Sequence, residues 1–134
     1  MNEKRFPPDD PREWLRRARS NLSQAKGGVQ LPEVCLEDLC FQAQQTAEKA
    51  MKGVLIALRV RFPYTHDLAE LLSLIEQTGQ IIPDQIREAA KLSDYAVEAR
   101  YPGLAEPVSR EEYKEAVTVA ELVISWAEGV ISSE

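Results

Sequence analysis

The chain has 134 residues, of which 44% are hydrophobic and 28% charged, as expected of one globular domain with an apolar core. No segment is apolar for long enough to span a membrane, and residues 1–13 lack the apolar stretch of a secretory signal, so we expect a cytoplasmic protein. With 16 basic and 22 acidic residues the net charge is −6, which argues against DNA as a partner and restricts any RNA contact to a local surface.

The first helix is predicted from its start and stop signals. Residues 1–9 are charged and rich in proline, which is typical of a loose N-terminal arm. Asp10 is a suitable N-cap, followed by proline at the first helical position and glutamate at the third. Gly27 and Gly28 then predict the end of the helix.

Two further helices are predicted on either side of a proline. An apolar stripe indicates a long second helix of roughly 28 residues, on the order of 40 Å, that starts near Pro32 and is ended by Pro63. Thr65 is the expected N-cap of a third helix, whose apolar face runs from Leu68 to Ile75 and which Gly79 ends.

The C-terminal third of the chain predicts two more helices. One runs from Pro83 to Ala99, where a Tyr-Pro-Gly sequence breaks it. The other begins at Ser109 with a capping box that Glu112 completes. The pattern therefore predicts an all-α, antiparallel bundle of about five helices that forms a single domain over residues 10–134.

Cysteine and histidine usage restricts the chemistry of any site. Cys35 and Cys40 have neither redox-pair nor zinc-ligand spacing, and we interpret them as small buried hydrophobic residues in a reducing compartment. His66 is the single histidine, so one chain cannot build a multi-histidine metal centre. The sequence also lacks phosphate-loop, dinucleotide and zinc-protease motifs, so we expect no metal and no cofactor.

Four strings in order carry a resemblance to a known family. They are Gln44 to Lys52 (QQTAEKAMK), Thr65 to Leu68 (THDL), Asp94-Tyr95, and Ala99 to Pro102 (ARYP). Over about residues 10–131 the chain resembles the prokaryotic HEPN domain family. The resemblance implies a helical bundle that dimerises and often acts beside a minimal nucleotidyltransferase as a toxin-antitoxin module. Many such proteins are metal-independent ribonucleases in which four to six residues lie between an arginine and the histidine that follows it.

Arg61 and His66 match that motif, with four residues between them, and Arg59 gives a second spacing of six. Phe62 follows Arg61 where the active ribonucleases usually have a polar residue, and Pro63 interrupts the segment. Cleavage through the RNA 2′-hydroxyl needs a group that exchanges protons near neutral pH, which suits His66, and a cation beside the phosphoryl oxygens, which suits Arg61. Because each chain has one histidine, separate imidazole acid and base would require a two-fold homodimer.

A structural role is the alternative for each of these residues. His66 can occupy the first turn of a helix with its ring bonded to a neighbouring carbonyl group. Arg61 is favourable near a helix C-terminus in any case. Glu48 and Lys52 form an i, i+4 pair that needs no further function, or else Glu48 or Lys49 ties this helix to Arg100.

A second group of candidate residues surrounds the break after the fourth helix. Asp94, Tyr95, Arg100 and Tyr101 could bind a nucleotide or a partner through aromatic and guanidinium stacking, or simply pack the helix end. Tyr64, two residues before His66, is a candidate for nucleotidylation by a partner, which would block that site.

Two functional hypotheses remain. The first is a toxin-like, metal-independent endoribonuclease that acts as a homodimer. The second is a non-catalytic module that binds a nucleotide or a minimal nucleotidyltransferase.

Overall fold

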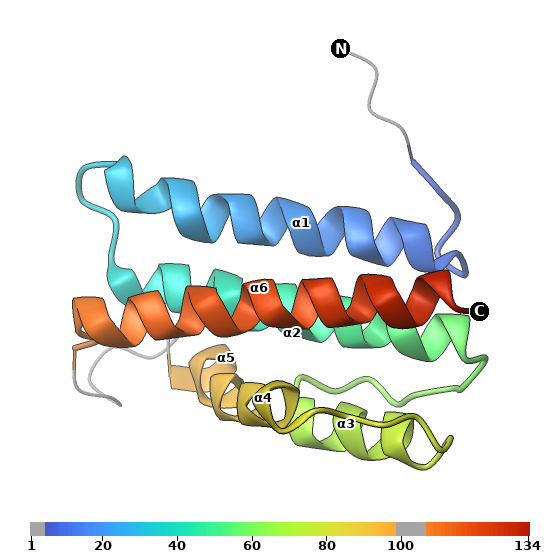
Figure 1. Cartoon of the computed structure of the whole chain (residues 1–134). Helices are drawn as coiled ribbons and strands as arrows, with labels where there is room; N and C mark the ends of the chain where they lie inside the picture. The colour runs from blue at the N-terminus through green and yellow to red at the C-terminus, as the bar shows by residue number, and fades with distance from the viewer. Residues whose placement is uncertain (1–4, 99–106) are drawn as a thin grey trace.

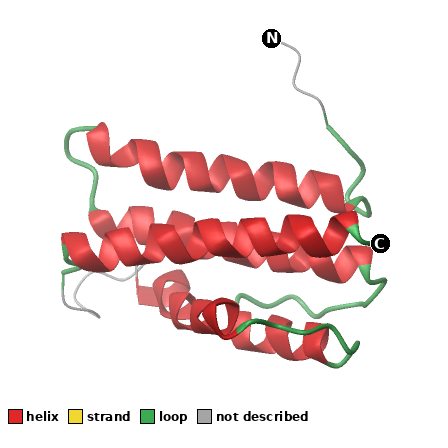
Figure 2. Ribbon diagram, in the orientation of Figure 1, coloured by secondary structure: helices red, strands yellow, loops and turns green. Residues whose placement is uncertain are grey.

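The protein is a bundle built around three long helices (Figures 1 and 2). A computed structural model describes residues 5–98 and 107–134. Throughout these ranges the chain forms helices and connecting segments without strands, which confirms the predicted all-α fold in a single domain. The α-helices are α1 (Pro11–Gly27), α2 (Leu36–Ala57), α3 (Leu68–Glu76), α4 (Asp84–Arg87), α5 (Tyr95–Glu98) and α6 (Arg110–Ser132), with 3₁₀ helices η1 (Gly28–Gln30) and η2 (Glu88–Asp94).

The three long helices do not all alternate in direction. The start of α1 lies beside the ends of both α2 and α6. A Cβ added to Gly53 of α2 would lie 3.1 Å from Cβ of Trp14 in α1 and 3.6 Å from Cδ1 of Ile131 in α6. At the other end, the hydroxyl of Tyr113 in α6 donates to the carbonyl of Ala25 in α1 over 2.6 Å. Thus α1 is antiparallel to its two neighbours, whereas α2 and α6 run in the same direction (Figure 1). Between α2 and α6 the chain returns to the end of the bundle where α2 starts, through a layer formed by α3, α4, η2 and α5.

Small side chains allow the long helices to pack closely. Alanines from all three are completely buried and join larger residues of α2 and α3 in one core. The largest fully buried apolar side chains are Met51, Leu55, Leu68, Leu71 and Ile75. Burial of such side chains is the main source of helix stability, because isolated helices of this length are marginal in water. None of the described helices combines the length and apolar character needed to span a bilayer.

Local capping signals locate two of the helix starts correctly. The Asp10 side chain accepts a hydrogen bond from the backbone of Arg12, and Ser109 and Glu112 form the predicted capping box of α6. The predicted cap of α3 was wrong by two residues, since Asp67 rather than Thr65 accepts from the backbone at Ala69.

The predicted bounds of α2 also need correction. The helix has 22 residues and starts at Leu36 rather than Pro32, because Glu33 has a left-handed φ of 65° that turns the chain before the helix. It ends at Ala57, before Pro63 can act, and Arg59 adopts a second left-handed conformation with φ 59°. The loop that contains the Arg61 to His66 motif is therefore longer than the sequence indicated.

The predicted fourth helix is divided into three short pieces, α4, η2 and α5. Its expected end at Ala99 lies outside the described residues. Cys40 is buried as expected, but Cys35 is exposed because it precedes α2 in extended backbone.

Part of the N-terminal segment contacts the bundle. The backbone amide of Phe6 donates to the Glu13 carboxylate over 3.0 Å, and the Trp14 indole donates to the carbonyl of Pro8 over 2.7 Å. These two bonds attach residues 6–8 to the first turn of α1.

Candidate functional site

The loop between α2 and α3 brings His66 against the buried face of α2. Nδ1 of His66 lies 2.9 Å from Oε1 of Glu48, while 35% of the histidine side chain remains exposed. Gln44 donates from its side-chain nitrogen to the His66 carbonyl oxygen over 3.1 Å. The ring and the backbone of His66 are therefore both held by residues of α2.

Glu48 lies at the centre of a polar group on one face of α2. Gln44, Glu48 and Lys52 are spaced by four residues, so the helix turns all three to the same side. The carboxylate accepts from Gln44 over 3.0 Å at Oε1 and from Lys52 over 2.9 Å at Oε2. Side chains of Glu48 and Lys52 are only 5% and 7% exposed, which identifies a buried ion pair rather than the surface pair expected from the sequence.

The hydrogen bonds around Glu48 determine its ionisation. Burial acts to raise the pKa of this carboxyl, but the bonds from Gln44, Lys52 and His66 outweigh burial and hold the pKa below its usual value. An ionised carboxylate only accepts hydrogen bonds, so Nδ1 of His66 must carry a hydrogen and donate it. This fixes the neutral tautomer whose lone pair is on Nε2, the nitrogen that can exchange protons with a substrate.

The rest of the motif lies on the exposed part of the same loop. Arg61 is exposed and makes no hydrogen bond or ion pair within the described residues. Tyr64 is 90% exposed, and its ring packs edge-on against the His66 ring with centroids 5.3 Å apart. The ammonium group of Lys52 lies 5.8 Å from the ring centroids of both Phe62 and Tyr64. The structure thus places Tyr64 beside His66 but shows no contact that joins Arg61 to it.

The second predicted group is only partly described. Asp94 is exposed and Tyr95 partly buried, whereas Arg100 and Tyr101 lie outside the described residues. Tyr95 packs on Cys40, and burial raises the pKa of both groups, that of Cys40 to about 11. A cavity of about 140 Å³ beside Tyr95 has more carboxylates than cations in its lining, which does not favour a phosphate there. Its charged lining residues are Glu88, Lys91, Glu112 and Glu115.

The chemistry available at the His66 loop is acid-base chemistry by an oriented imidazole. Among residues 5–98 and 107–134, no three histidine, cysteine or acidic side chains come together to hold a metal ion. The combination of a buried carboxylate, an imidazole and nearby cations suits proton transfer at a phosphodiester.

Both the sequence and the fold are similar to those of known proteins. The sequence matches the family model described as HEPN domain over residues 11–130. The chain belongs to the HEPN domain family.

Two solved structures support this assignment of the HEPN domain. The chain is similar to TT1696 from Thermus thermophilus, with 32% identity and a TM-score of 0.76 over 90% of this chain and 97% of that one. It is also similar to ST0689, an archaeal HEPN homologue, with 25% identity and a TM-score of 0.69 over 91% of this chain and 98% of that one. The comparison with curated proteins gives no match.

Glu48 was not predicted from the sequence of this HEPN domain as the partner of His66. A signal was available, because Gln44, Glu48 and Lys52 interrupt the apolar face of α2 at helical spacing. Polar residues that recur on a buried face must find partners inside the protein. We interpreted Glu48 and Lys52 as a local i, i+4 ion pair, which required no further partner. The contact between Glu48 and His66 was therefore not predicted.

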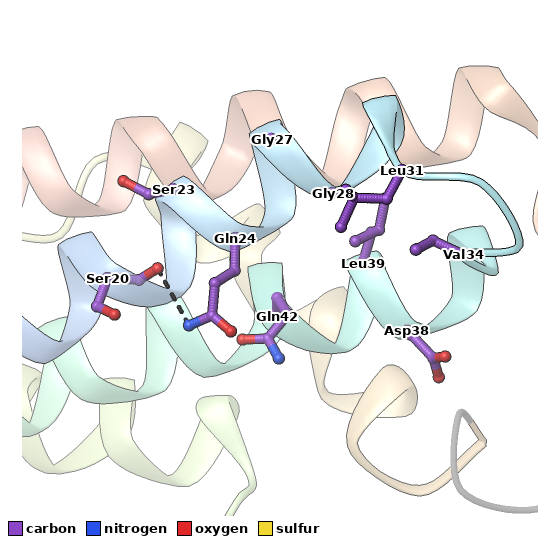
Figure 3. Close-up of a pocket in the computed structure, with 10 residues that line it drawn as sticks. All are labelled: Ser20, Ser23, Gln24, Gly27, Gly28, Leu31, Val34, Asp38, Leu39 and Gln42. Carbon is purple, nitrogen blue, oxygen red and sulfur yellow. Dashed lines mark hydrogen bonds between the residues drawn. The ribbon is translucent and has the colours of Figure 1, made fainter.

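The HEPN bundle has another cavity at the turn between α1 and α2 (Figure 3). Its volume is about 530 Å³, and Leu31 and Leu39 contribute to its apolar lining. Gly28 gives Leu39 room here, since an added Cβ would lie 2.4 Å from Cδ2 of Leu39 and that side chain would have to shift. This cavity contains none of the residues of the His66 loop.

Proposed function

We propose that this HEPN domain is a toxin-like, metal-independent endoribonuclease in which His66 transfers protons. The observation that carries the proposal is the 2.9 Å contact between Nδ1 of His66 and Oε1 of Glu48. A carboxylate in this position fixes the imidazole tautomer and stabilises the imidazolium that forms when Nε2 takes a proton. A histidine with only a packing role would not require a buried, ionised carboxylate behind it.

The reaction that fits these groups is transesterification of RNA. Nε2 of His66 removes the proton of a 2′-hydroxyl as its oxygen attacks the adjacent phosphorus. The bond from phosphorus to the 5′-oxygen breaks, and an acid protonates that oxygen. The products are a 2′,3′-cyclic phosphate and a 5′-hydroxyl end. Arg61, on the same loop, would stabilise the charge on the phosphoryl oxygens.

The local charge supports RNA as the substrate despite the net charge of −6. Glu48 and Lys52 form a buried pair with no net charge, so the carboxylate behind His66 does not repel a phosphate. Arg59 and Arg61 are exposed on the loop. A phosphodiester would therefore meet positive charge at this part of the surface.

A homodimer would supply the second proton-transfer group. With one histidine per chain, the general acid for the leaving oxygen is then the imidazole of a second copy. A two-fold axis near the His66 loop brings the same patch of each copy together. We therefore propose the homodimer as the active unit.

The test compares the chain with His66→Ala and with Lys91→Ala, a control at an exposed position in η2. His66→Ala should abolish RNA cleavage and growth arrest while helicity, measured by circular dichroism, and the mass in solution remain unchanged. Lys91→Ala should retain both activities. Cleavage that survives in a pure preparation of His66→Ala would overturn the proposed mechanism.

Exposure of Tyr64 favours a second proposal, in which a minimal nucleotidyltransferase partner regulates this HEPN domain. The phenol is 90% exposed and lies beside the His66 ring. Its oxygen would attack the α-phosphorus of a nucleoside triphosphate on the partner, with pyrophosphate as the leaving group and the phenolic proton passing to a base. The attached nucleotide would add bulk and negative charge where RNA must bind.

A further inference from the structure

Two adjoining cavities lie between the N-terminal segment, α1 and α2, and both are lined by Arg17 and Lys49. One has a volume of about 290 Å³ and a polar lining, which consists of Arg5, Arg16, Arg17, Ser20, Asn21, Gln24 and Lys49. The other has a volume of about 400 Å³ and includes Phe6, Pro8 and Trp14. None of these residues takes part in the proposed cleavage by His66.

The polar cavity is strongly basic in a chain that is acidic overall. Its described lining contains four cationic side chains, and Glu13 is the single carboxylate in the linings of the two cavities. Glu13 binds Arg16 at 2.7 Å and Arg17 at 2.9 Å, and these hydrogen bonds place the pKa of its carboxyl far below the usual range. Cations thus exceed carboxylates, and the one carboxylate present holds two of the four cations, Arg16 and Arg17.

Lys49 is a half-buried cation whose hydrogen-bond partner is neutral. Its ammonium donates to Oδ1 of Asn21 over 2.7 Å, and the Asn21 amide donates in turn to Gln42 over 2.6 Å. Burial and the positive charge of Arg17 lower the pKa of Lys49. Glu48 attracts Lys49 at longer range, but among the described residues no carboxylate bonds its ammonium directly, and a bound anion would supply that contact.

Arg17 is suited to meet the same anion. Its guanidinium bonds Glu13 through Nε, and the side chain is 60% exposed. The two terminal nitrogens of a guanidinium can bind a phosphate group through two parallel hydrogen bonds.

An aromatic path connects these cavities to the His66 loop. Trp14, which lines the apolar cavity, packs edge-on against Phe62 with ring centroids 6.1 Å apart. Phe62 belongs to the loop and lies beside Lys52, the ion-pair partner of Glu48. A single strand lying along this surface can therefore reach both places.

We propose that the two cavities form a subsite for one nucleotide unit of an RNA strand, with its phosphate between Arg17 and Lys49 and its base against Trp14. This assignment rests on the proposed function, because it places the strand that His66 would cleave. A free nucleotide offers the same chemistry, so the experiment includes it as a separate ligand. Stacking of bases on aromatic side chains and phosphate contacts with cations are the usual means of holding single strands.

The probe is a fluorescently labelled 2′-O-methyl RNA oligonucleotide, which His66 cannot cleave because the attacking hydroxyl is blocked. Binding is measured by fluorescence anisotropy for the chain and for Arg17→Gln/Lys49→Gln. The matched control is Arg19→Gln/Lys26→Gln, which removes the same charge from α1 at positions that pair with Glu128 and Glu121. Circular dichroism checks that each variant is folded.

We expect the cavity variant to bind the oligonucleotide at least about tenfold more weakly than the chain, and the control to bind nearly as tightly. The slope of log K against the logarithm of salt concentration should become shallower by about 0.7 for each phosphate that the cavity variant no longer binds. Equal reductions of affinity in the two variants, or an unchanged affinity in the cavity variant, would overturn the phosphate assignment.

The position of the base is tested separately with unlabelled oligonucleotide. Trp126→Phe leaves Trp14 as the only tryptophan, and its emission should change when the oligonucleotide binds. An unchanged emission would overturn the base assignment. Adenosine 5′-monophosphate is also tested as a competitor of the labelled oligonucleotide. If it competes as well as the unlabelled oligonucleotide does, the ligand is a free nucleotide, and the assignment of the subsite to an RNA strand is overturned.

The two proposals fail in different ways. Weak binding by the cavity variant, with no RNA cleavage by the unmodified chain, would support the nucleotide subsite and overturn the proposed ribonuclease activity. Full binding by the cavity variant, with RNA cleavage by the unmodified chain, would support the ribonuclease activity and overturn the nucleotide subsite.

Discussion

Nδ1 of His66 lies 2.9 Å from Oε1 of Glu48, although 18 residues separate the two in the sequence. Because the carboxylate is buried on α2, it holds the ring from behind and leaves the outer side of the loop accessible. The pair therefore has the arrangement in which a carboxylate positions an imidazole for proton transfer.

Glu48→Gln should lower RNA cleavage by at least about tenfold, because a neutral amide neither fixes the Nδ1 hydrogen as firmly nor stabilises the imidazolium. The measurement is the initial rate of cleavage across a range of pH, since a positioning role also changes the pH profile of the rate. Glu70→Gln, the same substitution at an exposed position of α3, serves as the control and should behave like the chain. A rate and profile unaffected by Glu48→Gln would show that the contact is only structural.

The same substitution should destabilise the fold by about 3 kcal/mol, because it leaves Lys52 buried without a countercharge. Adding Lys52→Met should recover most of this stability, since a flexible apolar side chain of similar length replaces the unpaired cation. Urea unfolding of the chain, the two single variants and the double variant measures the coupling free energy. Additive effects in the double variant would contradict a coupled pair.

The starts of α1 and α6 were predictable because their signals are local. The cap at Asp10 and the capping box at Ser109 depend only on residues within one turn of the helix start. The bounds of α2 depend on Glu33 and Arg59, two non-glycine residues in left-handed conformations. No local pattern marks such residues, since the surrounding structure imposes their conformation.

The site was only partly predictable for the same reason. His66 was evident as the single histidine beside a family motif, and Tyr64 as its neighbour. Glu48 reaches His66 through the path of a loop that the sequence does not specify. The parallel direction of α2 and α6 likewise follows from the return of the chain through α3 to α5 rather than from any one helix pattern.

Stability should depend on pH through Glu48. Burial raises the pKa of this carboxyl, but hydrogen bonds from Gln44, Lys52 and His66 more than compensate, so the folded pKa lies below the unfolded value of about 4.3. A depressed folded pKa contributes stability above the unfolded pKa and loses it as the pH falls through the folded pKa. Between about pH 5 and pH 3 the chain should therefore lose unfolding free energy more steeply than Glu48→Gln. Equal slopes in urea unfolding at matched pH would contradict this.

Tyr64→Phe tests the proposed regulation by a nucleotidyltransferase. Removing the hydroxyl should abolish nucleotide transfer to the chain, while RNA cleavage continues because the ring beside His66 remains. Mass spectrometry after incubation with the partner and a nucleoside triphosphate gives the readout. Tyr95→Phe is the control, since its ring is partly buried and packed on Cys40. A full nucleotide adduct on Tyr64→Phe would exclude Tyr64 as the modified residue.

The two adjacent glycines at the end of α1 should respond in opposite ways to alanine. Gly27 has helical backbone, and nothing lies within 4 Å of an added Cβ, so Gly27→Ala should raise the unfolding free energy by about 0.5–1 kcal/mol. At Gly28 the added Cβ would lie 2.4 Å from Cδ2 of Leu39, a core side chain with 5% exposure, so Gly28→Ala should cost about 1–3 kcal/mol. Urea unfolding of the two variants decides the matter, because both glycines have right-handed helical backbone and only Gly28 has the close contact with Leu39. Stabilisation by both substitutions would mean that Leu39 moves aside without cost and that α1 and α2 are not held at this distance.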